Sequence, residues 1–199
     1  MRRIVLIIIC LLLGTVESGL PQEPVRILIA YYSREGHTRA MAEAVHRGAA
    51  SVFGVQAVLR SVDSVAVSEL LAADAIIVGS PVYNANVAPA VQEFINRWPF
   101  QGSPLKDKIG AAFTTGGGIS AGEELVQVNL LHSMLIFGMI VVGGPHWQQP
   151  FGASAVTEEP PFEPKTSRPP VHRRFLQKGE ALGKRVASLA VRWKRAGQP

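Results

Sequence analysis

The segment from Ser33 to Thr38 carries the residue types that bind a phosphate group. Two hydroxyl side chains, Ser33 and Thr38, flank Gly36, which lets the backbone approach a ligand closely. The segment follows an apolar run and precedes a helical pattern, so the free N–H groups and dipole of a helix start favour an anion there. The candidate phosphate loop therefore consists of Ser33, Arg34, Glu35, Gly36, His37 and Thr38.

The loop matches neither of the two common nucleotide-binding patterns. It lacks the lysine of a Walker motif, and its single glycine does not make G-x-G-x-x-G, so a dinucleotide is not the first expectation. Taken alone, the segment also fits an ordinary strand-to-helix turn in which Thr38 caps the helix.

A second polar segment, Ser80 to Asn86, has residues suited to a planar ring. Tyr83 could stack on such a ring, and the Asn84 and Asn86 amides could hydrogen-bond its polar edge. The alternative is a turn whose asparagines tolerate unusual dihedral angles, which explains Asn86 but not Tyr83. The residues expected at the ring are Pro81, Val82, Tyr83 and Asn84.

A third segment, Thr114 to Gly122, contains four glycines. Such a loop brings backbone N–H groups close to a flat or anionic ligand, although a flexible connector would have the same composition. The ligand-binding residues expected in it are Thr114, Thr115, Gly116, Gly117, Gly118 and Ile119.

The elements that must position these loops alternate regularly. Apolar runs predict strands at 25–32, 55–59, 74–79, 109–114 and 139–142, and helical periodicity predicts helices at about 41–52, 67–72, 87–98, 122–137 and 171–194. Residues 144–170 are predicted as loop. This alternation is typical of an α/β parallel sheet covered by helices on both faces. Because ligands bind beyond the carboxyl ends of such strands, the three segments are expected to lie together.

Composition narrows the possible partners. The 199 residues suit one domain, and its net charge of +5 arises largely from basic residues between Lys165 and Arg195. That cluster is interpreted as the solvated face of a C-terminal helix rather than a contact with lipid or nucleic acid, because no nucleic-acid motif accompanies it. The single cysteine, Cys10, excludes an internal disulfide, and the five histidines lack metal-ligand spacing.

The N-terminus has the pattern of a targeting segment. Arg2 and Arg3 precede the apolar run Ile4–Leu13, which small and polar residues follow. The run is short for a membrane span. Residues 1–20 are therefore predicted to be a signal peptide or an N-terminal membrane anchor, with the folded domain at 25–197. The protein is expected to be exported or anchored on the extracytoplasmic side, with a cytoplasm-facing anchor as the alternative.

The three loops carry a family resemblance. YYSREGHT, DAIIVGSPVYNANVAPAVQEFINRW and FTTGGGISAGEE resemble the WrbA-type NAD(P)H:quinone oxidoreductases of the flavodoxin-like superfamily, from about Val25 to the C-terminus. The resemblance implies a three-layer flavodoxin-like sandwich whose five-stranded parallel sheet has the order 2-1-3-4-5. It also implies FMN as cofactor, NADH or NADPH as electron donor, two-electron reduction of a quinone, and a homodimer or homotetramer in which a neighbour completes the site.

Carried over by position, the resemblance assigns the phosphate to Ser33–Thr38, the isoalloxazine to Val82–Asn84 and its pyrimidine edge to Thr114–Ile119. No catalytic side chain is implied, because the flavin performs the chemistry. Glu35 stands where the family usually has an aromatic residue or threonine. The expected substrate-side residues are Trp98 (in the neighbouring subunit), Phe137, which stands where the family often has histidine, and His146.

Two other functions remain open from sequence. A one-electron flavodoxin-type carrier would share the fold, but such carriers are typically acidic and this chain is basic. A flavin-free interaction module at a membrane would use the basic C-terminal helix, but it would leave the glycine-rich third segment unexplained.

Overall fold

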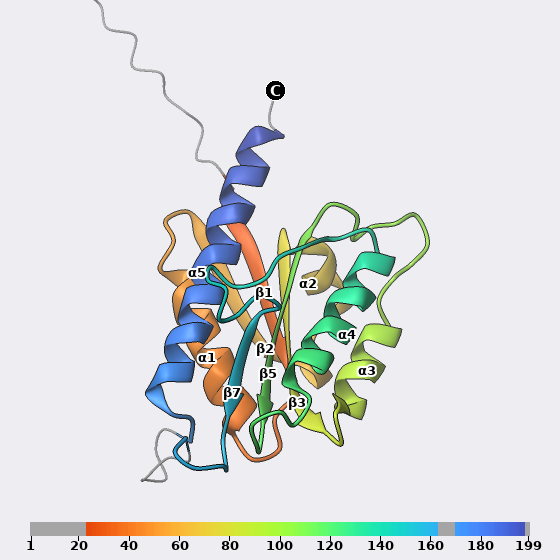
Figure 1. The fold of residues 1–199 in the computed structure, drawn as a ribbon. Helices are drawn as coiled ribbons and strands as arrows, with labels where there is room; N and C mark the ends of the chain where they lie inside the picture. Colours follow the sequence, from red (N-terminus) through yellow and green to blue (C-terminus); the bar gives the residue numbers. More distant parts are fainter. Residues whose placement is uncertain (1–22, 163–169, 198–199) are drawn as a thin grey trace, which may run out of the picture.

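The computed structural model describes residues 23–162 and 170–197, which form a sheet with helices on both faces (Figure 1). The strands are β1 (Val25–Tyr31), β2 (Val55–Ser61), β3 (Ala75–Tyr83), β4 (Asn86–Val87), β5 (Ile109–Gly116), β6 (Ile140–Val141) and β7 (Ala153–Val156). The helices are α1 (His37–Ala50), α2 (Val67–Ala72), α3 (Pro89–Asn96), α4 (Glu123–Ile136) and α5 (Arg173–Ala196), with a 3-10 turn at Val62–Ser64.

The sheet has the order β2-β1-β3-β5-β6, and all of these neighbours are parallel. This confirms the predicted α/β fold with its 2-1-3-4-5 order. The last strand is split, because β6 pairs with the start of β5 while β7 pairs with its end, Phe113 opposite Ala153. The prediction of loop throughout 144–170 was therefore wrong at β7. Four residues with small side chains give too short an apolar run to be recognised alone.

The second polar segment is partly strand and not wholly loop. β3 continues through Tyr83 and turns back at Asn84 and Ala85, whose φ angles are 49° and 60°. Positive φ at both central residues is the geometry that suits a two-residue hairpin, and β4 pairs antiparallel with the end of β3. Helix α3 consequently begins at Pro89, two residues later than predicted.

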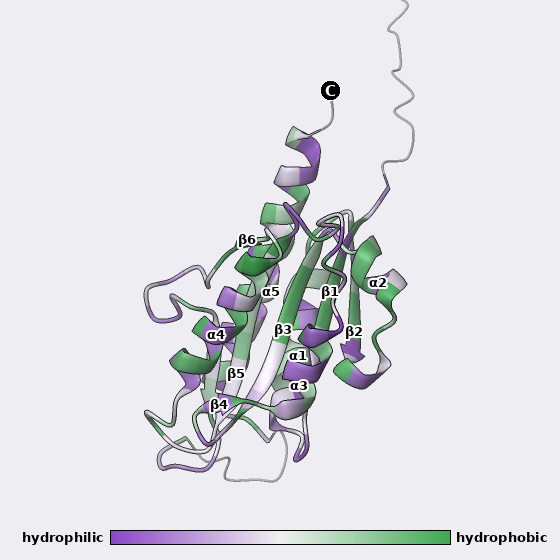
Figure 2. Cartoon of the chain, turned by 90° about the vertical axis from the view of Figure 1, so that its right-hand side faces the viewer, coloured by the Kyte–Doolittle hydropathy of each residue, from purple (hydrophilic) through white to green (hydrophobic). Residues whose placement is uncertain are grey.

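Two apolar layers hold the helices on the sheet. Successive residues of a strand point to opposite faces, so Ile27 and Ile29 of β1 face α1 and α5 while Leu28 faces the layer under α3 and α4. Figure 2 shows the apolar central strands enclosed between helices whose outer surfaces are mixed. Burial on both faces explains why β1 reads as a continuous apolar run.

Helices α1 and α5 approach each other so closely that only glycine fits at their contact. A Cβ atom on Gly183 would lie 1.9 Å from the Val45 carbonyl oxygen, and one on Gly48 would lie 2.0 Å from that of Glu180. At the edge of this contact, Arg47 and Glu180 form an ion pair of 3.0 Å. The two helices therefore form one closely packed layer behind β1 and β5.

Both chain ends of the described domain lie at the amino edge of the sheet. Figure 1 shows the start of β1 and the C-terminal turns of α5 at one end of the molecule and the start of α1 at the other. There Lys194 of α5 pairs with Asp74 at 3.0 Å. Over the described ranges, no helix has both the length and the apolar character needed to cross a bilayer. The predicted signal or anchor at 1–20 lies outside the described residues.

Candidate functional site

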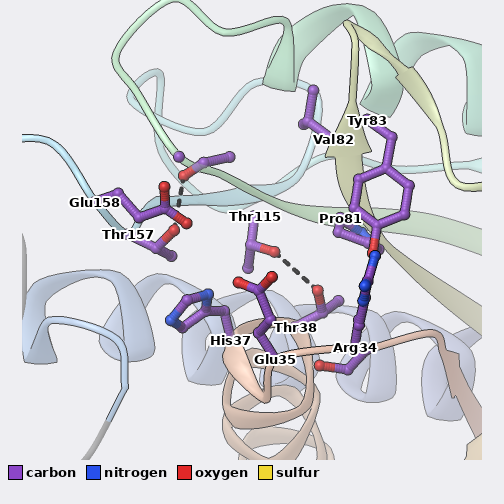
Figure 3. A pocket seen from close by; sticks show the side chains of 13 residues that line it. Arg34, Glu35, His37, Thr38, Pro81, Val82, Tyr83, Thr115, Thr157 and Glu158 are labelled. Atoms are coloured by element: carbon purple, nitrogen blue, oxygen red, sulfur yellow. Dashed lines mark hydrogen bonds between the residues drawn. The ribbon is translucent and has the colours of Figure 1, made fainter. Parts of the chain in front are cut away.

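A pocket of about 140 Å³ opens at the carboxyl edge of the sheet, where β1, β3 and β5 end (Figure 3). All three predicted loops contribute to it, as their positions after parallel strands required. The residues that line it are Ser33, Arg34, Glu35, His37, Thr38, Pro81, Val82, Tyr83, Thr115, Gly116, Gly117, Thr157 and Glu158.

Two threonines form part of the pocket wall. The hydroxyls of Thr38, at the start of α1, and Thr115, near the end of β5, are joined by a hydrogen bond of 2.8 Å. Both residues are almost completely buried. Because each hydroxyl has one proton and only one is used in their mutual bond, the pair retains one donor for a ligand in the pocket.

The start of α1 supplies an anion-binding geometry. Gly36, with φ of 95°, precedes the helix in a left-handed conformation that favours glycine, and its N–H donates to Ser33 Oγ at 3.1 Å. The next amides, those of His37 and Thr38, begin the helix and have no carbonyl of an earlier turn to bond. Together with the helix dipole, they favour a phosphate or another anion at this position.

Two carboxylates lie beside this anion site. One ligand atom from each of Glu35, His37 and Glu158 lies within 4.8 Å of the others, and Figure 3 shows the three side chains turned toward one another. The spacing of these residues in the sequence does not predict this group, because Glu158 follows β7, far along the chain from Glu35 and His37. Negative charge from the two glutamates opposes a bound anion, while Arg34 on the same pocket wall favours it.

Tyr83 forms the aromatic wall of the pocket. Its ring packs edge-on against Tyr32, with the ring centroids 6.5 Å apart. Burial raises the pKa of the Tyr83 phenol, and the neighbouring Tyr32 raises it further, so the phenol is neutral at physiological pH. Pro81 and Val82 continue this wall along β3. The wall is thus apolar and aromatic, as a flat ring requires.

The glycine-rich loop is held in place by the residues that follow β7. The N–H groups of Thr157 and Glu158 donate to the carbonyls of Gly116 and Gly117, each at 2.9 Å. The Ile119 N–H donates to Glu159 Oε2 at 2.6 Å. The loop is therefore braced along one side. Sequence reasoning missed Thr157 and Glu158 as pocket residues, because both lie in the stretch 144–170 that is predicted only as loop.

Some predicted ligand residues lie near the pocket without lining it. Asn84 is exposed in the hairpin turn, and Gly118 and Ile119 lie beyond the pocket wall. Thr114 is fully buried among residues of the opposite layer, and its Oγ1 has no hydrogen-bond partner within the described chain. Thr115 points into the pocket while Thr114 points away, because consecutive strand residues face opposite sides.

The three predicted substrate-side residues lie outside this pocket of the same chain. Trp98 is 4% exposed and packs against Phe137, with ring centroids 5.3 Å apart. Phe137 follows the C-terminal end of α4, which lies toward the amino edge of the sheet. His146 is exposed in the connection between β6 and β7. Burial also leaves little of the Trp98 ring available to a neighbouring subunit.

Comparison with known proteins agrees with this geometry. Residues 25–153 match the family described as NADPH-dependent FMN reductase. The chain belongs to that family. It is 30% identical over 211 residues to an NAD(P)H dehydrogenase (quinone) of Geotalea uraniireducens, covering 84% of this chain and 98% of the relative. A flavodoxin of Aquifex aeolicus is 32% identical over 123 residues, covering 59% of this chain and 64% of that protein.

Solved structures show the same fold. The flavodoxin, WrbA-like protein from Agrobacterium tumefaciens superposes with a TM-score of 0.70 at 23% identity, covering 84% of this chain and 98% of that one. A flavodoxin from the domain Archaea gives a TM-score of 0.64 at 24% identity, covering 84% and 99%. The flavodoxin-like fold and the predicted family resemblance are thus confirmed, and the chain is an oxidoreductase of an FMN-binding family.

Proposed function

We propose that the protein uses FMN to transfer two electrons from NADH or NADPH to a quinone. The observation that carries this proposal is the pairing of an anion site with an aromatic wall in one pocket. The amides at the start of α1 and the Thr38–Thr115 hydroxyl pair suit a phosphate, and Tyr83 lies across the pocket from them. A flat ring system that carries a phosphate would match both parts of the pocket: its phosphate the anion site, and its ring the aromatic wall.

The residues present fit FMN. Its phosphate would be held by Ser33, Thr38 and the first amides of α1. Its ring would lie between the β3 segment Pro81–Tyr83 and the glycine-rich loop, where the absence of side chains at Gly116 and Gly117 lets backbone N–H groups come close. The carboxylates of Glu35 and Glu158 disfavour further negative charge, so the pyrophosphate of the nicotinamide donor is expected to stay outside this part of the pocket.

When bound, FMN supplies the redox chemistry that the protein's own side chains lack. The protein's part is to orient the ring and to stabilise negative charge on it. The backbone N–H groups of the braced loop suit the second task, because they are held in place before reaction. The neutral Tyr83 phenol provides a wall that adds no charge to the ring face.

The proposal is tested by reconstituting the purified protein with FMN and following NADPH or NADH consumption with benzoquinone. We expect the visible absorption of bound flavin and one quinone reduced per nicotinamide oxidised. A protein that stays colourless after reconstitution would contradict flavin binding and favour an interaction module. Bound flavin without quinone-dependent oxidation of either nicotinamide would contradict the enzymatic activity alone.

The similarity to a flavodoxin of Aquifex aeolicus makes one-electron transfer the second candidate function. A reductive titration separates the two. A two-electron enzyme passes directly from oxidised to fully reduced flavin, whereas a carrier accumulates the one-electron-reduced form.

Assembly and location are also parts of the proposal. A homodimer or homotetramer would let a neighbouring chain cover the open side of the pocket, and light scattering of the reconstituted protein gives its mass. Export or anchoring through residues 1–20 is supported by the Arg2-Arg3 start and the Ile4–Leu13 apolar run. Mass spectrometry of the protein from its membrane and soluble fractions would show whether the segment is retained.

A further inference from the structure

A surface at the amino edge of the sheet combines exposed aromatic rings with positive charge. We propose that this surface docks the folded domain onto an anionic phospholipid membrane. It is called the basal patch here and consists of Phe53 and four residues at the end of α5, Arg192, Trp193, Lys194 and Arg195. Lys194 and Arg195 line a groove together with Phe53, and Arg192 and Trp193 are exposed on the same turn of the helix. Docking departs from the interpretation of the basic C-terminal cluster as a solvated face, because the structure has two exposed aromatic rings at the same end of the domain. This inference does not depend on the proposed redox activity.

The aromatic part of the basal patch comes from two separate elements. Phe53, in the turn between α1 and β2, is 92% exposed, and Trp193, in the last turns of α5, is 52% exposed. Exposed rings of this size cost solvation free energy in water. At the boundary between lipid headgroups and hydrocarbon, aromatic rings are favoured, and tryptophan is enriched there.

A groove of about 220 Å³ lies between the Phe53 turn, the end of α5 and the start of β1. Glu23 and Val25 line it on one side, Phe53 and Gly54 on another, and Val191, Lys194 and Arg195 of α5 complete it. The Val25 N–H donates to the Gly54 carbonyl at 2.8 Å, which fixes the Phe53 turn against the start of β1.

The charge of the basal patch is available to a ligand. Lys194 is engaged with Asp74 at 3.0 Å, but within residues 23–162 and 170–197 neither Arg192 nor Arg195 forms an ion pair. Both arginines are exposed. Figure 2 shows hydrophilic residues along the end of α5 that projects from the body of the domain. Anionic headgroups attract basic residues held near the membrane surface.

The sequence that precedes Glu23 favours lipid over other anionic partners. It contains the apolar run Ile4–Leu13, behind Arg2 and Arg3. The run has ten residues, about half of the roughly 20 apolar residues that a membrane-spanning helix needs. A single weak hydrophobic anchor binds membranes marginally, and a basic surface close to it supplies the second contact that stable binding needs.

Docking through the basal patch orients the pocket. The patch lies at the amino edge of the sheet and the pocket at the carboxyl edge, so the seven residues of β1 separate them by about 23 Å. Figure 1 shows the two ends on opposite sides of the domain. The pocket would therefore face water, and its substrates would reach it from the aqueous side.

The test uses the full chain with vesicles of phosphatidylcholine alone and of phosphatidylcholine mixed with phosphatidylglycerol. Arg192→Gln/Arg195→Gln removes the free charges of the patch. Arg173→Gln/Arg174→Gln is the matched control, since it removes the same charge from exposed positions at the opposite end of α5. The apolar N-terminal run is present in every variant. Each arginine near an anionic surface is worth about fivefold in affinity, so we expect roughly a 25-fold loss for the patch variant on anionic vesicles and little loss for the control.

A second measurement locates the surface. Brominated lipids quench tryptophan fluorescence only at close range, and the exposed tryptophans are Trp193 in the patch and Trp147, which is 85% exposed in the β6–β7 connection. We expect quenching on vesicles to persist in Trp147→Phe and to disappear in Trp193→Phe. The opposite assignment would overturn the proposal.

Three further outcomes would also overturn it. Equal losses in the two arginine pairs would show that only overall charge matters, and no loss in either would show that the patch does not contact lipid. Loss of binding to duplex DNA in the patch variant, with vesicle binding intact, would assign the surface to nucleic acid. Circular dichroism of each variant shows whether the fold is kept.

Discussion

Thr38 and Thr115 share a hydrogen bond of 2.8 Å that joins the start of α1 to the end of β5 inside the pocket. The two residues come from different predicted loops, and both are almost completely buried. The bond therefore fixes the relative position of the helix amides and the glycine-rich loop, which are the two parts of the proposed phosphate and ring sites.

Replacing Thr115 by valine should weaken FMN binding. The substitution removes the hydroxyl and leaves Thr38 without its partner, a loss of about 1 kcal/mol, so the dissociation constant should rise about fivefold. Fluorescence titration of the apoprotein with FMN measures this.

Thr114→Val is the matched control for that experiment, because the Thr114 hydroxyl is buried on the other side of β5 and has no hydrogen-bond partner among residues 23–162 and 170–197. We expect unchanged FMN affinity and a gain of roughly 1 kcal/mol in the free energy of unfolding, since a buried unsatisfied hydroxyl is removed. If Thr114→Val weakened FMN binding as much as Thr115→Val, the assignment of the two side chains to opposite faces would be wrong.

Glu158→Gln should strengthen FMN binding. The Glu158 carboxylate lies with Glu35 and His37 next to the anion site, so removing its charge lowers the electrostatic cost of a bound phosphate. A gain of about three- to tenfold is expected at low salt, which calorimetric titration would measure. The gain should shrink as ionic strength rises. A gain that did not change with salt would point to a change of loop structure instead.

Gly183→Ala should destabilise the protein, although this exchange normally stabilises a helix. Alanine is favoured over glycine by about 1 kcal/mol in a helix interior. Here the added Cβ would lie 1.9 Å from the Val45 carbonyl oxygen, so α5 must move off α1, at a cost of about 1–3 kcal/mol. Urea denaturation gives the free energy of unfolding. Ser188→Ala, at a half-buried position of the same helix, should change it by less than about 0.5 kcal/mol.

Glu69→Gln should reduce stability at neutral pH more than at acid pH. The Ala66 N–H donates to the Glu69 carboxylate, which holds its pKa below the usual value, and Arg60 lowers it further. A lowered pKa in the folded state means that this carboxylate contributes its full stabilisation above its unfolded pKa, and that the contribution is lost as the pH falls through the folded pKa. Urea denaturation of both proteins across this range checks the sign. A difference that grew toward acid pH would contradict it.

The fold class, and the edge of the sheet at which the pocket opens, follow from local sequence patterns. Buried parallel strands such as β1 are continuous apolar runs, and a parallel sheet brings the loops after β1, β3 and β5 to one edge whatever their exact register. The proposed phosphate loop could be predicted because its features, a glycine before a helix start with hydroxyls on either side, lie within six consecutive residues.

Which side chains meet in the pocket depends on the packing of elements that are distant in the sequence. Whether Thr114 or Thr115 faces a ligand depends on the register and facing of β5, which loop composition does not encode. Thr157 and Glu158 reach the pocket because the short strand β7 pairs with the end of β5. The four residues of β7 form too short a pattern to predict that pairing. Trp98 and Phe137 pack against each other outside the pocket because α3 and α4 bring them together. Such contacts depend on how distant elements pack, and local sequence patterns do not contain that information.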